Sequence, residues 1–320
     1  MAPTPTTAEI EHAASLLRAG RVVAFPTETV YGLGANALDA DAVARIYAVK
    51  RRPATSPLIV HVSSIEMARS LVAGEAAWPE TAERLTQKFW PGPLTLVLPK
   101  SPAIPHIVTA GLSTVGLRMP SHPIALALIR AAGVPLAAPS ANRFTELSPT
   151  TAEHVRGSLN GDVDYVLDGG PCDVGIESTV ISLAEPRPLL LRPGGISRGE
   201  LESVIGTVGS AKGPSAGAHP APGMHARHYS PRTRLILISN GESPERGRGV
   251  YLQHAHEIRT AAHVVVRRMP KSAAEYAASL YSALHEADDA NADWIAVDLP
   301  PTAPEWEAVH DRLRRAARKD

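Results

Sequence analysis

The residues of this chain that could perform chemistry are basic and hydroxyl side chains placed within or just after short apolar segments. Arg118 lies between Leu117 and Met119, and Arg192 follows three leucines. An arginine in such a position must face a carboxylate or a ligand, because an uncompensated charge is costly to bury. Other apolar segments end in further cations and hydroxyl donors, namely Lys50, Arg51, Arg52, Thr29, Thr114, Ser140, Ser148 and Ser178. The pattern predicts a site for an anionic ligand.

A compact cationic element, KRRP, occupies residues 50–53. Cations at the end of a helix are favoured by the helix dipole alone, so the run by itself does not indicate a ligand. Its proline, however, predicts a rigid turn that would hold Arg52 and Ser56 beside His61, and this arrangement suits bidentate contact with phosphate oxygens. Taken alone, His61 is more typical of a buried structural histidine than of a ligand.

Three better-known signatures are incomplete or absent. Gly32, Gly34 and Ala37 fit the dinucleotide pattern GxGxxA, but arginines rather than an acid for the ribose lie about 20 residues later, so no organic cofactor is expected. His225 and His228 lack a further ligand set with recognisable spacing, so no metal site made by the protein is expected. Without a GxxxxGK[ST] loop, any ATP would be held by scattered side chains.

The composition limits the class of protein. The 320 residues include 32 basic and 32 acidic ones, so no overall field draws the chain onto nucleic acid or a membrane. The one cysteine, Cys172, cannot form an internal disulfide and is expected to have no chemical role. No apolar stretch approaches the roughly 18 residues of a membrane span. We expect a protein of the cytoplasm that does not enter a membrane.

The candidate residues are carried by alternating strand-like and helical segments. Helices are expected between Thr6, a capping-box residue, and Gly20, and over residues 40–50, 64–73, 79–89, 122–132 and 150–158. Strands are expected over residues 21–26, 57–62, 94–99, 115–120, 134–139, 164–170, 178–183 and 188–194. This alternation predicts an α/β domain whose sheet is covered by helices and whose polar strand-end loops share one crevice.

The composition changes after residue 205. Residues 206–232 are rich in Gly, Ala, Pro, Ser and His and are expected to form a linker. A smaller α/β domain is expected over residues 233–320, after the larger one over residues 1–205. Its strands are expected over residues 233–239, 249–253, 263–269 and 293–300, and its helices over residues 272–286 and 305–318.

Taken together, the motifs resemble those of the YrdC-type threonylcarbamoyl-AMP synthases in their longer form, which has a C-terminal Sua-type domain. The elements FPTETVYGLGANA, KxRP, PLIVH, WPGPLTLVL, TAGLSTVGLRMP, VPLAAPSAN, SPTTAEHV, GIESTVIS and LLRPGGIS follow one another in family order between about residues 8 and 205. APGMHARHYSP, at 221–231, resembles the linker element of the longer form.

The resemblance implies an open twisted sheet with a concave groove, of YrdC-like fold, followed by a smaller Rossmann-like domain. It implies a nucleotidyltransferase that forms threonylcarbamoyl-AMP and pyrophosphate from L-threonine, bicarbonate or CO2, and ATP with Mg²⁺. The product would serve N6-threonylcarbamoyladenosine modification of tRNA next to the anticodon, through a downstream tRNA threonylcarbamoyl transferase complex.

The resemblance also implies roles for individual residues. Arg118 would bind the threonine carboxylate, and Lys50 and Arg52 would lend charge to catalysis. The remaining threonine contacts would be Thr29, His61, the backbone at Ala138, and Ser178. The ATP contacts would be Arg52, Ser56, Thr114, Ser140, Ser148, Arg192 and Tyr229, the last from a linker that acts as a lid. This sequence departs from the family pattern at Ser56, at residues 143–146 and at His225.

Other functions are compatible with parts of the pattern. An RNA-binding module without catalysis would use the same basic groove for tRNA phosphates, although an aromatic stacking platform is lacking. Weak tRNA binding could also accompany catalysis. Carbamoyl transfer from carbamoyl phosphate is a second enzymatic alternative, and a structural or ribosome-assembly role is a third. Threonine-dependent pyrophosphate release distinguishes the synthase from all three.

Overall fold

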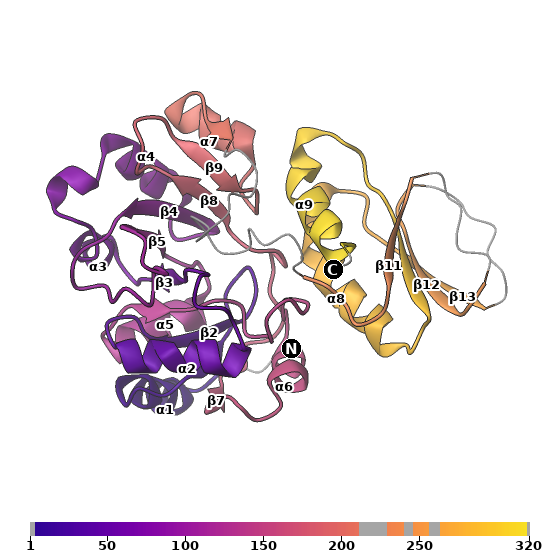
Figure 1. The fold of residues 1–320 in the computed structure, drawn as a ribbon, viewed down its shortest axis with the longest axis horizontal. Coiled ribbons are helices and arrows are strands. Elements are labelled where there is room, and N and C mark those ends of the chain that lie inside the picture. Colours follow the sequence, from indigo (N-terminus) through magenta and orange to yellow (C-terminus); the bar gives the residue numbers. More distant parts are fainter. Residues whose placement is uncertain (1–3, 211–228, 240–245, 256–262, 319–320) are drawn as a thin grey trace.

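Two sheets organise the chain, and helices lie between them (Figure 1). The computed structural model describes residues 4–210, 229–239, 246–255 and 263–318. The larger sheet is built from strands before residue 211, and the smaller one belongs to the C-terminal unit, residues 235–316. Helices α8 (Ala273–Asp289) and α9 (Glu307–Ala316) of the C-terminal unit face the larger sheet.

The larger sheet has ten strands in the order β10-β9-β8-β4-β5-β3-β6-β2-β1-β7. It contains both parallel and antiparallel pairs, and the three pairs from β3 through β6 and β2 to β1 are all antiparallel, so it is a mixed sheet with two open edges. Its strands are β1 (Val23–Phe25), β2 (Gly32–Asn36), β3 (Ile59–His61), β4 (Leu94–Pro99), β5 (Thr114–Arg118), β6 (Leu136–Ala137), β7 (Tyr165–Val166), β8 (Thr179–Ser182), β9 (Leu189–Arg192) and β10 (Gly209–Ser210). The predicted α/β class with an open sheet is confirmed.

All but one of the α-helices of this part begin after a residue whose side chain caps the first turn; the helix that follows Pro79 has no such cap. Thr6 and Glu9 form the expected capping box, and Asp39 accepts hydrogen bonds from the first turn of the next helix, so orphan backbone N–H groups are satisfied. The helices are α1 (Thr7–Arg18), α2 (Ala40–Lys50), α3 (Ile65–Ser70), α4 (Glu80–Phe89), α5 (Pro123–Ala132), α6 (Ala152–Leu159) and α7 (Arg198–Ile205), with a short 3₁₀ turn, η1 (Glu75–Ala77).

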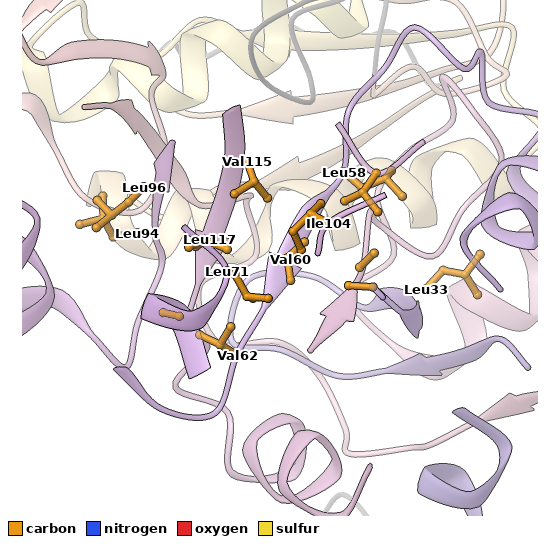
Figure 2. Close-up of a cluster of buried hydrophobic side chains, with 14 of the residues drawn as sticks. Leu33, Leu58, Val60, Val62, Leu71, Leu94, Leu96, Ile104, Val115 and Leu117 are labelled. Atoms are coloured by element: carbon orange, nitrogen blue, oxygen red, sulfur yellow. The ribbon is translucent and has the colours of Figure 1, made fainter. Parts of the chain in front are cut away.

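The main core places one face of β3 and β5 against apolar neighbours. Val60 on β3 and Leu117 on β5 are fully buried in it, as Figure 2 shows. Burial of each such side chain contributes roughly 1.5–3 kcal/mol. Because side chains alternate between the two faces of a strand, His61 and Arg118 must point to the other face. The two strands are parallel and in a register that pairs His61 with Arg118, so these polar groups lie side by side.

The smaller sheet is entirely parallel, in the order β11-β14-β12-β13. Its strands are β11 (Leu235–Ile238), β12 (Gly249–Gln253), β13 (Val264–Arg268) and β14 (Trp294–Asp298), and a 3₁₀ turn, η2 (Pro304–Trp306), precedes α9. The strands and both helices agree with the predicted segments. Among the described residues, no helix is both long and apolar enough to cross a membrane.

Four elements were not predicted: β2, α7, β10 and the 3₁₀ turn η1. Gly32 and Gly34 fit part of the dinucleotide pattern in the sequence, but in the structure they lie within the strand β2. A Cβ on Gly34 would stand 2.7 Å from the Phe25 ring, so glycine is required there by close packing. A signal for α7 was present in the sequence, because Ser197 and Glu200 form a capping box.

Candidate active site

One cavity lies beside the polar face of β3 and β5 and extends to the loop before β8. Its volume is about 540 Å³ when the space at its mouth is counted. The cavity brings together the predicted cations Arg52, Arg118 and Arg192 with Ser140. Its remaining lining residues are Thr27, Thr29, Val30, Gly32, Ile59, His61, Ala138, Pro139, Glu177, Ser178 and Tyr229. All five residues that the resemblance implies for threonine are in this set.

Arg118 is held by partners on three sides of its guanidinium. One terminal nitrogen forms an ion pair of 2.7 Å with a Glu28 carboxylate oxygen, and the other donates to Thr29 Oγ1 at 2.9 Å. Its Nε donates to the Gly92 carbonyl at 3.4 Å. The sequence left a carboxylate or a ligand open as the partner of Arg118, and the structure shows the carboxylate. Glu28 is therefore a site residue that sequence reasoning missed.

His61 stands next to Arg118 in an almost fully buried position. Burial, followed by the charge of Arg118, lowers the pKa of His61 to about 3. Its Nδ1 has no hydrogen-bond partner among the described residues. A neutral imidazole is therefore presented to the cavity at physiological pH and can donate or accept one hydrogen bond to a ligand.

The neutrality of His61 predicts a pH dependence of stability. Its pKa is lower in the folded state than the unfolded value of about 6.5. The folded protein thus binds fewer protons, and its stability should fall by about 1.4 kcal/mol per pH unit between pH 6.5 and 3 on account of this group. We expect the difference in unfolding free energy between wild type and His61→Asn to shrink as pH falls from 7 to 5, measured by denaturant titration. Replacement of the exposed His106 by asparagine is the control. A pH-independent difference would refute this assignment.

Arg52 lies at another part of the cavity wall and is oriented by the turn that follows α2. Its guanidinium donates to the carbonyls of Ser56 (3.4 Å) and Pro57 (3.1 Å) and lies 5.7 Å from the centre of the Phe144 ring. Burial is the main cause that lowers the pKa of Arg52 to about 10, so it remains cationic at neutral pH. The predicted rigid turn therefore does present a buried cation to the cavity.

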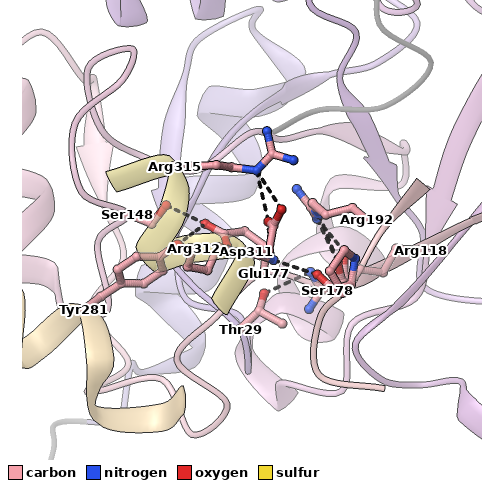
Figure 3. A network of polar contacts seen from close by, with 11 residues as sticks. Thr29, Arg118, Ser148, Glu177, Ser178, Arg192, Tyr281, Asp311, Arg312 and Arg315 are labelled. Carbon is pink, nitrogen blue, oxygen red and sulfur yellow. Dashed lines mark hydrogen bonds and ion pairs between the residues drawn. The ribbon is translucent and has the colours of Figure 1, made fainter. Parts of the chain in front are cut away.

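Arg192, at the end of β9, is bound to the residue before β8. It donates from Nε and from a terminal nitrogen to the Ser178 carbonyl, at 3.1 and 2.9 Å, and also reaches Ser178 Oγ at 3.1 Å (Figure 3). The two strand ends can approach this closely because Gly194 has no side chain. A Cβ there would stand 2.3 Å from the backbone nitrogen of Thr179.

Four of the residues to which the resemblance gives a role do not line the cavity. Lys50 is buried, and its ammonium donates to the carbonyls of Ser140 (2.6 Å) and Asn142, so it supports the loop that carries Ser140. Burial, followed by the charge of Arg52, lowers the pKa of Lys50 well below its usual value. The other three are Ser56, which is buried behind Arg52, Thr114, which is half-buried at the start of β5, and Ser148, whose hydroxyl donates to Glu177.

Tyr229, in the predicted linker, is the first residue that the structure describes after residue 210, and it is buried against the cavity. The next residue, Ser230, donates its backbone N–H to the Thr145 carbonyl at 2.9 Å. Residues 143–146, where the sequence departs from the family pattern, thus hold the end of the linker near Arg52. His225 and His228 lie outside the described residues, and no group of three metal-binding side chains occurs among the described ones.

The C-terminal unit also reaches the cavity. Arg312 of α9 forms an ion pair with Glu177 at 2.7 Å, and Tyr281 of α8 donates to the same carboxylate at 3.0 Å (Figure 3). Glu177, Tyr281 and Arg312 were not predicted as site residues. Arg312 carried a signal, since it falls in the apolar stripe of Val309, Leu313 and Ala316 that α9 buries.

Comparison with family models gives two matches that together span nearly the whole chain. Residues 15–194 match the Sua5/YciO/YrdC model, described as "Telomere recombination". Residues 196–318 match a model described as "Threonylcarbamoyl-AMP synthase, C-terminal domain".

Individual relatives resemble the chain over 72–98% of its length. It is 45% identical to a threonylcarbamoyl-AMP synthase of Bacillus subtilis, over 97% of this chain and 93% of the relative. A threonylcarbamoyl-AMP synthase of Pyrococcus abyssi is 52% identical over 72% of this chain and 68% of its own. The structure is similar to that of P. abyssi Sua5 complexed with L-threonine, with a TM-score of 0.89 and 40% identity over 98% of this chain and 96% of that one.

Proposed function

The chain belongs to the threonylcarbamoyl-AMP synthase family, and we propose that its cavity seats L-threonine beside the α-phosphate of ATP. As a member of that family it is a nucleotidyltransferase of tRNA threonylcarbamoyladenosine synthesis. The observation that carries the proposal is the convergence of three buried arginines with a neutral histidine on one cavity. Such a cavity can bind a carboxylate and a polyphosphate at the same time.

Threonine is proposed to occupy the end of the cavity formed by His61 and Arg118. Its carboxylate would bind the Arg118 guanidinium, which Glu28 and Thr29 hold in position. His61, neutral because it is buried, adds no charge to repel the threonine ammonium. The Ala138 backbone and Ser178 complete the proposed contacts.

ATP is proposed to bind between Arg52 and Arg192, with Ser140 and Tyr229 in contact. The threonine ammonium first loses a proton, bicarbonate takes up a proton and releases CO2 and water, and the free amine then adds to CO2 to give a carbamate with loss of a second proton. A carbamate oxygen then attacks the α-phosphorus, and the bond to the β,γ-diphosphate breaks, so pyrophosphate leaves. The arginines stabilise the charge on the phosphate oxygens, and catalysis depends on positioning rather than on a protein nucleophile.

Mg²⁺ is proposed to enter with ATP as part of the substrate. Glu177 is the one carboxylate among the described lining residues, and Arg312 already pairs with it. The described wall thus offers Mg²⁺ no open carboxylate, and phosphate oxygens and water are its expected ligands. We further propose that the reaction takes place in the cytoplasm and that a tRNA threonylcarbamoyl transferase complex uses the product, with at most weak tRNA binding by this chain.

Mass detection of threonylcarbamoyl-AMP after incubation with ATP, Mg²⁺, bicarbonate and threonine tests the proposed function. We expect one pyrophosphate per molecule formed, with both products absent when threonine is omitted. Serine in place of threonine is the specificity control. Salt-dependent tRNA binding without pyrophosphate release would instead support the RNA-binding alternative.

A further inference from the structure

Glu177 has a charge that is unexpected at a site for polyphosphate. The other charged side chains among the described lining residues are Arg52, Arg118 and Arg192. The Glu177 carboxylate is almost fully buried and lies next to Ser178, the residue that Arg192 binds. A bare carboxylate in this position would repel the phosphates that the arginines attract, most strongly where water is excluded.

Three donors from different parts of the chain surround the Glu177 carboxylate. Ser148 Oγ donates at 2.6 Å, the Tyr281 hydroxyl at 3.0 and 3.2 Å to the two oxygens, and Arg312 Nε at 2.7 Å. Two of the three, Tyr281 and Arg312, belong to the C-terminal unit. Figure 3 shows α9 bringing Arg312 directly against Glu177.

The pair is fully ionised and held rigidly. Burial opposes ionisation of Glu177, but the charges of Arg312 and Arg192 and the hydrogen bond from Ser148 outweigh it and lower its pKa. Arg312 is 1% exposed, and its remaining terminal nitrogens donate to the Pro193 carbonyl (3.0 Å) and to Asp311 (2.8 Å). Its guanidinium also lies 5.2 Å from the centre of the Tyr229 ring.

We propose that Arg312 is a positioning residue of the nucleotide site, which neutralises Glu177 so that the ATP phosphates can approach Arg192 and Arg52. The C-terminal unit then forms part of the ATP site, and its docking is coupled to ATP affinity. The Glu177 carboxylate connects the loop at Ser148 with Tyr281 of α8 and Arg312 of α9. The positive charge of Arg312 offsets the repulsion that this carboxylate would otherwise exert on the phosphates. This inference rests on the proposed function, since it takes ATP to be the anion in the cavity.

The inference is tested by steady-state kinetics of three full-length variants, Arg312→Met, Glu177→Gln and the double variant. Arg312→Met leaves the carboxylate bare, so we expect the KM for ATP to rise at least tenfold while the KM for threonine changes less than threefold. In Glu177→Gln and in the double variant no carboxylate remains. We expect both to have a KM for ATP within threefold of wild type. If Glu177→Gln restores the KM for ATP in the Arg312→Met background, Arg312 acts by neutralising the Glu177 charge. A merely structural role of Arg312 would not be rescued in this way.

Arg314→Met is the matched control, because Arg314 is exposed on the same helix and loses the same charge. Thermal unfolding of each variant shows whether it is folded, and Arg312→Lys, which keeps the charge, replaces Arg312→Met if the latter does not fold. We then expect wild-type ATP affinity for Arg312→Lys and for the double variant. A double variant that still binds ATP tenfold more weakly, or a folded Arg312→Met with wild-type KM, would overturn the inference. An inactive wild type would instead refute the proposed function.

Discussion

Replacement of Arg118 by alanine is expected to abolish threonine-dependent pyrophosphate release. The guanidinium is the proposed partner of the threonine carboxylate, and its two charge-assisted hydrogen bonds would contribute together about 4 kcal/mol. We therefore expect kcat/KM for threonine to fall by about a thousandfold. The measurement is pyrophosphate release over a range of threonine concentrations at saturating ATP.

The effect of Arg118 on binding must be separated from its effect on folding. Its removal leaves Glu28 buried without its partner, and breaking such a pair costs about 3–5 kcal/mol of stability. The double variant Arg118→Met with Glu28→Gln removes both charges, so it should recover much of the stability but none of the activity. Near wild-type turnover in a folded variant would show that Arg118 does not bind threonine.

Replacement of Arg52 by alanine is the second change expected to have a large effect. Arg52 is the buried cation that the turn after α2 presents to the proposed phosphates. Loss of one preorganised group that stabilises transition-state charge typically costs about 10²–10³ in rate. We expect a loss of pyrophosphate release of this size, with threonine binding, measured by calorimetry, unchanged.

The adjacent Arg51 provides a matched control for this variant. Arg51 has the same side chain but is exposed, and its φ of 51° is as unfavourable for arginine as for alanine. Arg51→Ala should therefore retain wild-type activity and stability. Equal losses in the two variants would show that the general charge of the turn, rather than the position of Arg52, accounts for the effect.

Helices with a clear hydrophobic periodicity and an N-cap residue, and strands that are continuous apolar runs, could be predicted from the sequence. Residues 40–50 after the Asp39 cap and the apolar run 94–99 agree with α2 and β4 to the residue. The strand β2 could not be recognised, because Gly34 is required by its close approach to the Phe25 ring, which the local sequence does not reveal. Local sequence patterns thus predicted these helices and strands but not the close packing between them.

Two cations of the site, Arg118 and Arg192, could be predicted because a charged residue is unusual in an apolar segment. Arg118 and Arg192 end apolar strands, and alternation along a strand fixes the face on which each lies. Their partners could not be predicted, because Glu28 is paired with residue 118 and Glu177 with residue 312 only in the folded chain. Periodicity indicates which side of an element is buried, but it does not identify what lies opposite.

The ion pair between residues 177 and 312 also has a consequence for synthesis on the ribosome. The larger sheet is complete at residue 210, and domains generally fold as units while the chain is still emerging. At about 5–20 residues per second, translation from residue 210 to residue 312 takes roughly 5–20 s. During that interval the nascent chain can form the larger sheet, but Glu177 lacks its ion-pair partner because Arg312 has not yet been synthesised. The chain should therefore reach its full affinity for ATP only after α9 has left the ribosome.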